Sequence, residues 1–146
     1  MKKFLVILSF CISSLIIAQA PPPPSVPTED NKVLIDELIR VTEFENYFNN
    51  YCKTKVEQAA KENNWDEKKK HEISNSINFR YFKGSIYNSF SSDSKETLHN
   101  AVILFKNMNS TRKESVLKIV PINEMLQINL EGYVKSMLKG NYLISN

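Results

Sequence analysis

The residues that could do metal chemistry in this 146-residue chain are its two histidines. His71 and Glu72 match the start of a zinc-protease helix, in which a second histidine four residues after the first completes the ligand pair. This chain has Asn75 at that position, and its other histidine, His99, lies well down the chain. The spacing therefore predicts no metal site, and we expect no metal or other cofactor.

Thiol chemistry would rest on Cys52, because Cys11 lies in an apolar stretch at the N-terminus. Cys52 is four residues from both Phe48 and Val56, which places it on an apolar helical stripe. Burial among apolar side chains raises the pKa of a thiol and makes it a poor nucleophile. We expect Cys52 to pack in the core, and the alternative is an intermolecular disulfide through an exposed thiol.

A short basic run, Lys68-Lys69-Lys70, is flanked by acidic residues on both sides. This mixture of charges favours a solvated helix face over a phosphate-binding or nucleic-acid patch. No glycine-rich loop and no pair of nucleophile and base accompanies the run. The sequence therefore predicts a protein that is not an enzyme.

Aromatic residues are plentiful, and their helical spacing is typical of core positions. Tyr47, Tyr51 and Tyr81 also have a polar tip, and such residues suit the edge of a groove. We regard these three as candidates for a groove that holds a small apolar ligand. No motif for a particular ligand accompanies them.

The N-terminal residues 1–20 have the pattern of a secretory signal peptide. Lys2 and Lys3 precede an apolar stretch over residues 4–17, and Ala18 and Ala20 are the small residues expected at a cleavage site. The stretch is too short for a stable membrane anchor, so we expect an exported protein, periplasmic or secreted. Loss of Lys2 and Lys3 lowers the net charge of +3 to about +1, which speaks against a nucleic-acid partner.

The remaining chain divides into three parts. Prolines cluster in residues 21–28, which predicts an extended polyproline spacer. Residues 29–140 contain only three glycines and one proline, with apolar residues at helical spacing, and we expect a single all-α domain there. Residues 141–146 form a predicted C-terminal tail.

Five helices are expected in the domain. The first covers residues 29–41, capped by Thr28 or Asp30, and a capping box of Thr42 and Glu45 breaks the chain before the second. The second helix runs to about Lys61, with its apolar stripe at Phe44, Phe48, Cys52, Val56 and Ala59, and Asn63-Asn64 ends it.

The third helix is predicted from about Trp65, capped by Asn64, to Tyr87 or Ser89. It is apolar on two opposed sides, so we place it at the centre of the bundle. The fourth opens at residues 91–93 with Asp93 and Glu96 at capping-box spacing, and its inner stripe is Leu98, Ala101, Val102, Phe105 and Met108. The fifth begins with a capping box of Thr111 and Glu114 and ends at Gly140. Pro121 lies within it, and because the apolar residues before and after Pro121 fall on the same side of the helix, we expect a kink there and not a break.

Two segments, residues 34–44 and 87–106, resemble a family of small exported bacterial helical proteins, domain of unknown function 2059. That family has a Tyr-x-x-x-Phe-Ser/Thr segment before a helix that ends in Phe-Tyr. In this chain two residues, and not three, separate Tyr87 from Phe90. Phe105 matches the phenylalanine at the helix end, and Lys106 stands where the family has the tyrosine. The resemblance implies a bacterial origin, export and an all-helical fold, and no activity is established for the family.

Two functions follow as hypotheses. The first is an exported, non-enzymatic protein that acts by contact with another protein or with a second copy of itself. The alternative is a protein that binds a small apolar ligand or lipid in a cleft beside the third helix, because that helix has more aromatic residues than one packed face requires.

Overall fold

The computed structural model describes residues 26–113 and 117–143. Within these ranges the chain forms six α-helices and no strand, which confirms the all-α prediction. The helices are α2 (Glu29–Val41), α3 (Phe44–Glu62), α4 (Glu67–Asn75), α5 (Phe79–Ser89), α6 (Lys95–Ser110) and α7 (Glu124–Leu138). The predicted cleavage site at Ala18 and Ala20 lies outside the described residues.

The first helix, α2, has the predicted bounds, and Thr28 is its N-cap, with Oγ1 accepting from the Asn31 amide at 3.2 Å. The predicted break at Thr42 is also present, but the capping box is wrong. Thr42 is fully buried at the end of α2 and donates its hydroxyl to the Leu38 carbonyl at 2.7 Å. The residue before α3 is Glu43, whose side chain makes no cap and whose φ of 48° is left-handed.

The second helix, α3, buries all five residues of the predicted stripe. It ends as predicted at the asparagine pair. Asn63 donates its side-chain amide to the Ala59 carbonyl at 2.8 Å, and Asn64 takes a left-handed φ of 50°. Asparagine tolerates this conformation better than most residues, which explains why the chain turns here.

The prediction of one long third helix is wrong, because the chain breaks into α4 and α5 at residues 76–78. Asp66, and not Asn64, caps α4, and the Ser76 hydroxyl donates to the Ile73 carbonyl at 2.7 Å. Asn78 is extended and its Oδ1 accepts from the Arg80 amide at 3.0 Å to start α5. Serine and asparagine side chains thus take the backbone partners that a continuous helix would use.

The predicted centre of the bundle is corrected as well. In α5 only one side is buried, through Phe79, Phe82 and Ile86, whereas Tyr81 on the other side is 61% exposed. The helix with the most helical neighbours is α3, which packs against α2, α4, α5 and α7. α5 has partners on one side because the break at residues 76–78 separates it from α4.

The N-cap of the fourth helix, α6, lies one residue later than predicted. Ser94 is its N-cap, with Oγ accepting from the Thr97 amide at 3.0 Å, so the box of Asp93 and Glu96 is wrong. Of the predicted inner stripe, Leu98 and Val102 are buried and Ala101 and Phe105 are half-buried, whereas Met108 is exposed.

The predicted kinked last helix is wrong. Residues 117–123 are not helical, and α7 begins at Glu124, where Oδ1 of Asn123 accepts from the Leu126 amide at 2.8 Å. Pro121 lacks an amide hydrogen and disfavours the helical conformation of the residue before it, and Asn123, two residues further on, provides the N-cap at which α7 starts. The predicted start at Thr111 is wrong, because Thr111 is the C-cap of α6, and its expected box partner Glu114 lies outside the described residues. The end at Gly140, with φ of 81°, is confirmed.

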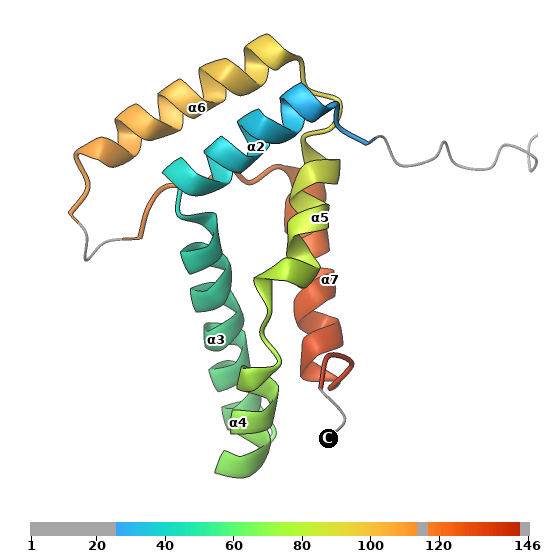
Figure 1. The fold of residues 1–146 in the computed structure, drawn as a ribbon. Coiled ribbons are helices and arrows are strands. Elements are labelled where there is room, and N and C mark those ends of the chain that lie inside the picture. Colours follow the sequence, from blue (N-terminus) through green and yellow to red (C-terminus); the bar gives the residue numbers. More distant parts are fainter. Residues whose placement is uncertain (1–25, 114–116, 144–146) are drawn as a thin grey trace, which may run out of the picture.

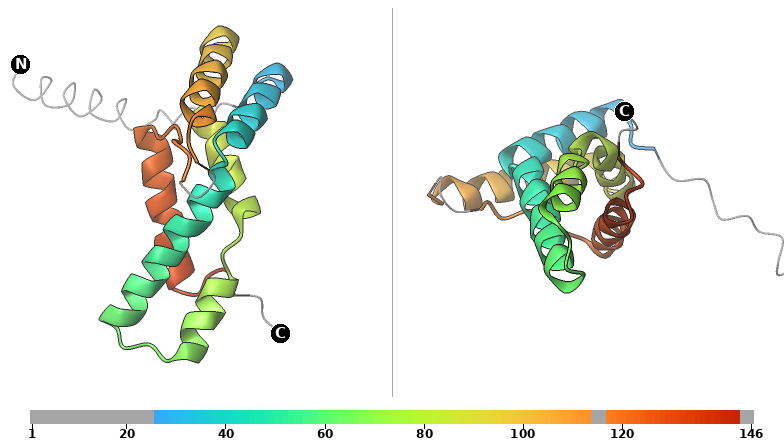
Figure 2. Two further views of the ribbon diagram at one scale, coloured as in Figure 1. Left: turned by 90° about the vertical axis from the view of Figure 1, so that its left-hand side faces the viewer. Right: turned by 90° about the horizontal axis from the view of Figure 1, so that it is seen from below.

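Figures 1 and 2 show the arrangement of the helices. α2 and α6 lie side by side across one end, α3, α5 and α7 extend away from them, and α4 lies beside α3 at the far end. We call α2 and α6 the arm, and α3, α5 and α7 the aromatic bundle.

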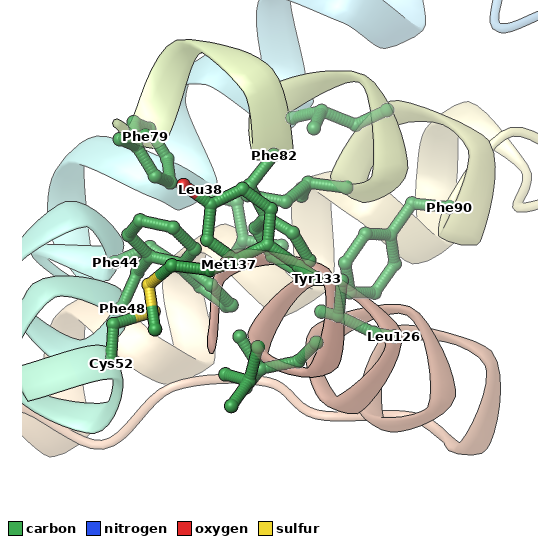
Figure 3. Packing of buried hydrophobic residues seen from close by; sticks show 14 of the residues in the cluster. Leu38, Phe44, Phe48, Cys52, Phe79, Phe82, Phe90, Leu126, Tyr133 and Met137 are labelled. Carbon is green, nitrogen blue, oxygen red and sulfur yellow. The ribbon is translucent and has the colours of Figure 1, made fainter. Parts of the chain in front are cut away.

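The aromatic bundle is named after the rings at its centre (Figure 3). The ring of Phe48 lies 5.5 Å from Phe79, 5.1 Å from Phe82 and 5.0 Å from Tyr133, measured between centroids. These rings come from three helices, so they hold α3, α5 and α7 together.

Candidate functional site

The two histidines lie on helices at opposite ends of the molecule. His71 is on α4 and His99 is on α6, and both are exposed (Figure 1). In residues 26–113 and 117–143, no group of three or more His, Cys, Asp or Glu side chains is arranged to hold a metal ion.

Cys52 is part of the core, as predicted. Its side chain is 0% exposed, and burial raises the pKa of the thiol to about 12. Very little thiolate exists at neutral pH with such a pKa, so Cys52 has the character of a small apolar side chain. A buried sulfur is also unsuited to the alternative of an intermolecular disulfide.

The three consecutive lysines have different surroundings. Lys70 Nζ lies 3.1 Å from a Glu67 carboxylate oxygen and 3.5 Å from one of Glu57, so it links α4 to α3. Lys69 Nζ lies 4.6 Å from the centre of the Trp65 ring, within the range of a cation–π contact. These contacts fit the predicted mixed-charge face.

The candidate groove tyrosines fall into two separate groups. Tyr47 and Tyr51 stack on α3, with centroids 6.2 Å apart. Tyr81 on α5 stacks instead on Tyr142 at 5.6 Å, and Tyr142 in turn stacks on Tyr133 at 4.9 Å. Between the described residues the two groups have no direct ring contact, and they are connected only through the core rings of Phe44, Phe79 and Phe48.

Sequence reasoning missed the role of Tyr142, which was assigned to the C-terminal tail. The residue follows the left-handed turn at Gly140, and no periodicity in a segment so short could have revealed its packing. Tyr133 is buried on α7, and its hydroxyl accepts a hydrogen bond from the Asn78 amide at 3.0 Å. Burial raises the pKa of Tyr133, so its hydroxyl stays protonated.

A polar cluster of Asp36, Lys83 and Tyr87 joins α2 to α5, and it too was missed. An Asp36 oxygen lies 2.8 Å from Lys83 Nζ and accepts from the Tyr87 hydroxyl at 2.7 Å. Partial burial acts to raise the pKa of Asp36, but the hydrogen bonds from Lys83 and Tyr87 outweigh it and hold the pKa below its usual value. The hydrogen bond to Asp36 raises the pKa of Lys83.

The pKa of Tyr87 is raised, first by burial and then by its hydrogen bond to the Asp36 carboxylate. With a raised pKa the Tyr87 hydroxyl stays protonated at neutral pH, so it remains available to donate its hydrogen bond to Asp36. The cluster therefore acts as a link between two helices, and its geometry offers no group poised to take up a proton near neutral pH.

A stripe of apolar residues on α6 stands largely in solvent. Leu104 is 54% exposed and Met108 is 41% exposed, and half-buried Ala101 and Phe105 lie beside them at spacings of three and four residues. Of the described helices, α2 is the main partner of α6. We call Ala101, Leu104, Phe105 and Met108 the α6 stripe.

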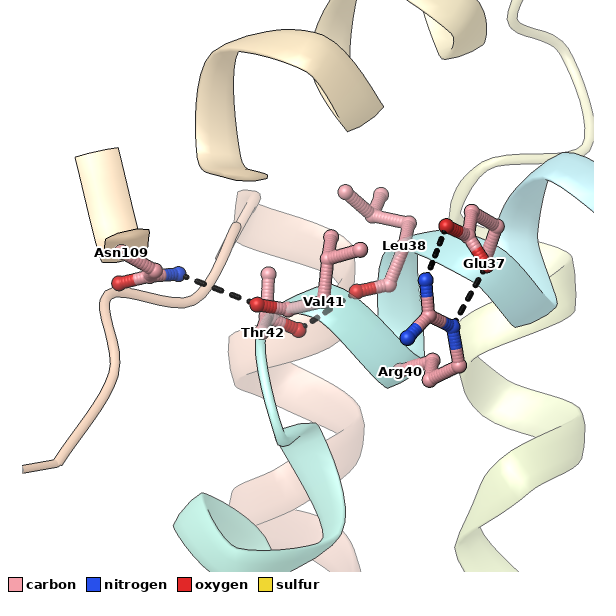
Figure 4. Close-up of polar contacts among 6 residues, drawn as sticks. All are labelled: Glu37, Leu38, Arg40, Val41, Thr42 and Asn109. Atoms are coloured by element: carbon pink, nitrogen blue, oxygen red, sulfur yellow. Dashed lines mark hydrogen bonds and ion pairs between the residues drawn. The ribbon is translucent and has the colours of Figure 1, made fainter. Parts of the chain in front are cut away.

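Asn109 holds the end of α6 in place (Figure 4). Its side-chain amide accepts from the Ile119 amide at 2.7 Å, donates to the Ile119 carbonyl at 2.9 Å, and lies 3.5 Å from the Val41 carbonyl at the end of α2. One buried side chain thus ties α6, α2 and the segment before α7 together. It also fixes the C-terminal end of the helix that carries the α6 stripe.

Three hollows mark the surface of the described residues. A cleft of about 530 Å³ lies between α4 and the C-terminal end of α7. A smaller one of about 220 Å³ lies beside Trp65, and another of about 270 Å³ lies at the end of α6, beside Arg40 and Lys106. None of the three is lined by Tyr47, Tyr51 or Tyr81.

In the described ranges, no helix combines the length and the hydrophobicity needed to span a membrane. Comparisons with family models, with curated proteins and with solved structures each found no match to this chain.

Proposed function

We propose that this chain is an exported helical protein that works by contact with another protein through the α6 stripe, and that it catalyses no reaction. The observation that carries the proposal is the exposure of Leu104 and Met108 on a helix with one main partner. Apolar residues that gather on an exposed face are typical of interaction surfaces.

The position of the stripe supports the proposal. Phe105 and Ala101 are half-buried, so contact with a partner would remove further apolar area from water at little loss of side-chain freedom. α7 also exposes Met125 and Ile128, but no half-buried aromatic ring accompanies them on that side. We therefore place the contact on α6 and use α7 as the comparison.

Crosslinking tests the contact surface. A photoreactive amino acid replaces Leu104 in one variant and Ile128 in another, and both are irradiated in the host cell. We expect a discrete protein adduct from position 104 and none from position 128, and the double variant Leu104→Ser/Met108→Ser should lose binding to the adducted protein. Equal adducts from both positions, or none from position 104, would contradict the proposal.

Sedimentation at several concentrations separates the two kinds of partner. A second copy of the chain predicts a mass that rises with concentration and that the double serine variant abolishes. A different protein predicts a constant monomer mass for the purified chain.

Export has its own test. The signal-peptide pattern predicts a processed protein outside the cytoplasm whose N-terminal residue is Pro21. Cell fractionation with N-terminal sequencing measures both. Recovery of a cytoplasmic protein that still begins with Met1 would refute export and leave the proposal for α6 standing.

A further inference from the structure

The cleft between α4 and the end of α7 has features that the contact through α6 does not use. Its volume of about 530 Å³ lies in the range of sites for small molecules, about 300–1,000 Å³. α4 forms one wall, and the turn after α7 forms the other. In Figure 1 both lie at the end of the molecule far from α6.

The apolar part of the cleft lining comes from three side chains. Ile73 of α4 is buried, Leu138 at the end of α7 is half-buried, and Leu143 is exposed at the rim. The left-handed turn at Gly140 brings Leu143 back, with its amide donating to the Gly140 carbonyl at 3.1 Å. A Cβ at Gly140 would lie 3.1 Å from Leu143 Cδ1, so a glycine there allows the close approach.

The rim is charged, with an excess of cations. Lys68, Lys69 and Lys139 line the cleft together with Asp66 and Glu72. Asp66 is already used, because its Oδ1 accepts from the Lys69 amide at 2.7 Å. Within the described part of the chain, neither Lys68 nor Lys139 forms an ion pair.

The two helix ends at the cleft do not cancel this excess. α4 begins there, and the positive end of its dipole adds to the attraction for an anion. α7 ends there with the opposite sign, but its terminal carbonyls are engaged: that of Met137 accepts from Gly140, and that of Ser136 accepts from Asn141. The cleft therefore combines an apolar floor with a cationic rim.

We propose that this cleft binds one molecule of a free fatty acid, its acyl chain on Ile73, Leu138 and Leu143 and its carboxylate beside Lys68 and Lys139. Ammonium groups at the rim suit a carboxylate, and the apolar floor suits a single hydrocarbon chain. The site is separate from the α6 stripe, and each proposal can fail alone.

Titration calorimetry with dodecanoate below its micellar concentration tests the site. We expect saturable binding at one site per chain. Dodecyltrimethylammonium, which has the same chain length and the opposite charge, should bind at least about tenfold more weakly.

Paired charge reversals locate the site. Lys68→Glu/Lys139→Glu should weaken dodecanoate binding about tenfold or more, whereas Lys53→Glu/Lys106→Glu, which changes the net charge equally at exposed positions away from the cleft, should leave it unchanged. Leu143→Ser tests the apolar lining independently of the charges and should weaken dodecanoate binding several-fold. Circular dichroism checks that each variant is folded.

The remaining outcomes contradict the proposal. Equal weakening by both charge-reversal pairs would mean that dodecanoate responds only to net charge. Binding at many sites, or none, would exclude a defined cleft. Binding to phosphatidylglycerol vesicles without binding of monomeric dodecanoate would assign the lysines to a lipid surface instead.

Discussion

The aromatic bundle and the arm are held together by different means. In the bundle, the rings of Phe48, Phe82 and Tyr133 pack with their centroids within 5.9 Å of one another. The arm buries the smaller side chains of Leu98 and Val102 between its helices and is fastened at both ends by polar contacts. α6 therefore combines a small number of buried apolar side chains with directional bonds at its ends, whereas α3 depends on more extensive apolar burial.

This difference predicts unequal stability within one chain. Apolar burial stabilises by about 25 cal/mol for each Å² removed from water, and a helix with one main partner removes less area than a helix with several. We expect α6 to open at a lower free energy than α3, as a local unit. The proposed interaction surface on α6 would then lie on a helix that unfolds locally more easily than α3.

The largest effect is expected at the centre of the bundle. Phe48→Ala removes a fully buried ring from contact with Phe79, Phe82 and Tyr133 and should lower the free energy of unfolding by about 3–5 kcal/mol. Urea unfolding followed by circular dichroism measures it. Phe105→Ala on α6 is the matched control and should lose clearly less, so equal losses would remove the contrast between bundle and arm.

The next effect separates the arm from the bundle. Asn109→Ala leaves the Ile119 amide and carbonyl without their partner and should lower stability by about 1–3 kcal/mol. Hydrogen exchange should become faster in α6 and residues 117–123, while α3 keeps its protection. The exposed neighbour Asn107→Ala is the control. Faster exchange throughout α3 would show that the arm and the bundle open together.

A smaller, stabilising effect is expected where the arm joins the bundle. Glu43 has a left-handed φ of 48°, which side chains with a Cβ adopt at a cost of about 1–2 kcal/mol. Glu43→Gly relieves this strain but gives the unfolded chain more freedom, so we expect a net gain of about 0.5–1 kcal/mol in urea unfolding. Asn64→Gly should gain less, because asparagine tolerates its φ of 50°. A larger gain at Asn64 would argue against strain at Glu43.

The smallest effect concerns the link between α2 and α5. Asp36→Asn weakens the contacts with Lys83 and Tyr87 at a largely exposed site and should lower stability by about 0.2–1 kcal/mol at pH 7. Because the folded-state pKa of Asp36 is lowered from 3.8, its contribution is complete above that value and disappears as the pH falls through the folded-state pKa. The raised pKa of Lys83 predicts a second loss above pH 10.5.

Unfolding of the wild type and of Asp36→Asn across pH tests this sign. The difference between them should shrink toward acid and toward strong base. A difference that grows toward acid would mean that Asp36 is destabilised by its neighbours.

Sequence patterns were most successful where one strong signal decided the structure. The stripe from Phe44 to Ala59 predicted the buried face of α3, and Asn63-Asn64 and Gly140 predicted two helix ends, because residues that accept a left-handed φ are few. These features depend on residues near each other in the chain.

Sequence patterns failed where distant parts of the chain decide. The break at residues 76–78 is stabilised by the Tyr133 hydroxyl, which accepts from the Asn78 amide across 55 positions. The non-helical segment at Pro121 is held by Asn109. The periodicity of apolar residues on either side of Pro121 gives no sign of this contact. The Tyr81–Tyr142–Tyr133 stack likewise depends on the turn after α7.

The direction of the two arm helices constrains how the chain folds during synthesis. Asp30 meets Lys95 near their N-terminal ends and Val41 meets Asn109 near their C-terminal ends, so α2 and α6 run parallel. Such neighbours need a long intervening segment, and Lys95 follows Asp30 by 65 positions. α2, the first of the described helices to leave the ribosome, must therefore wait with one apolar side uncovered until α6, which ends at position 110 of 146, has been synthesised.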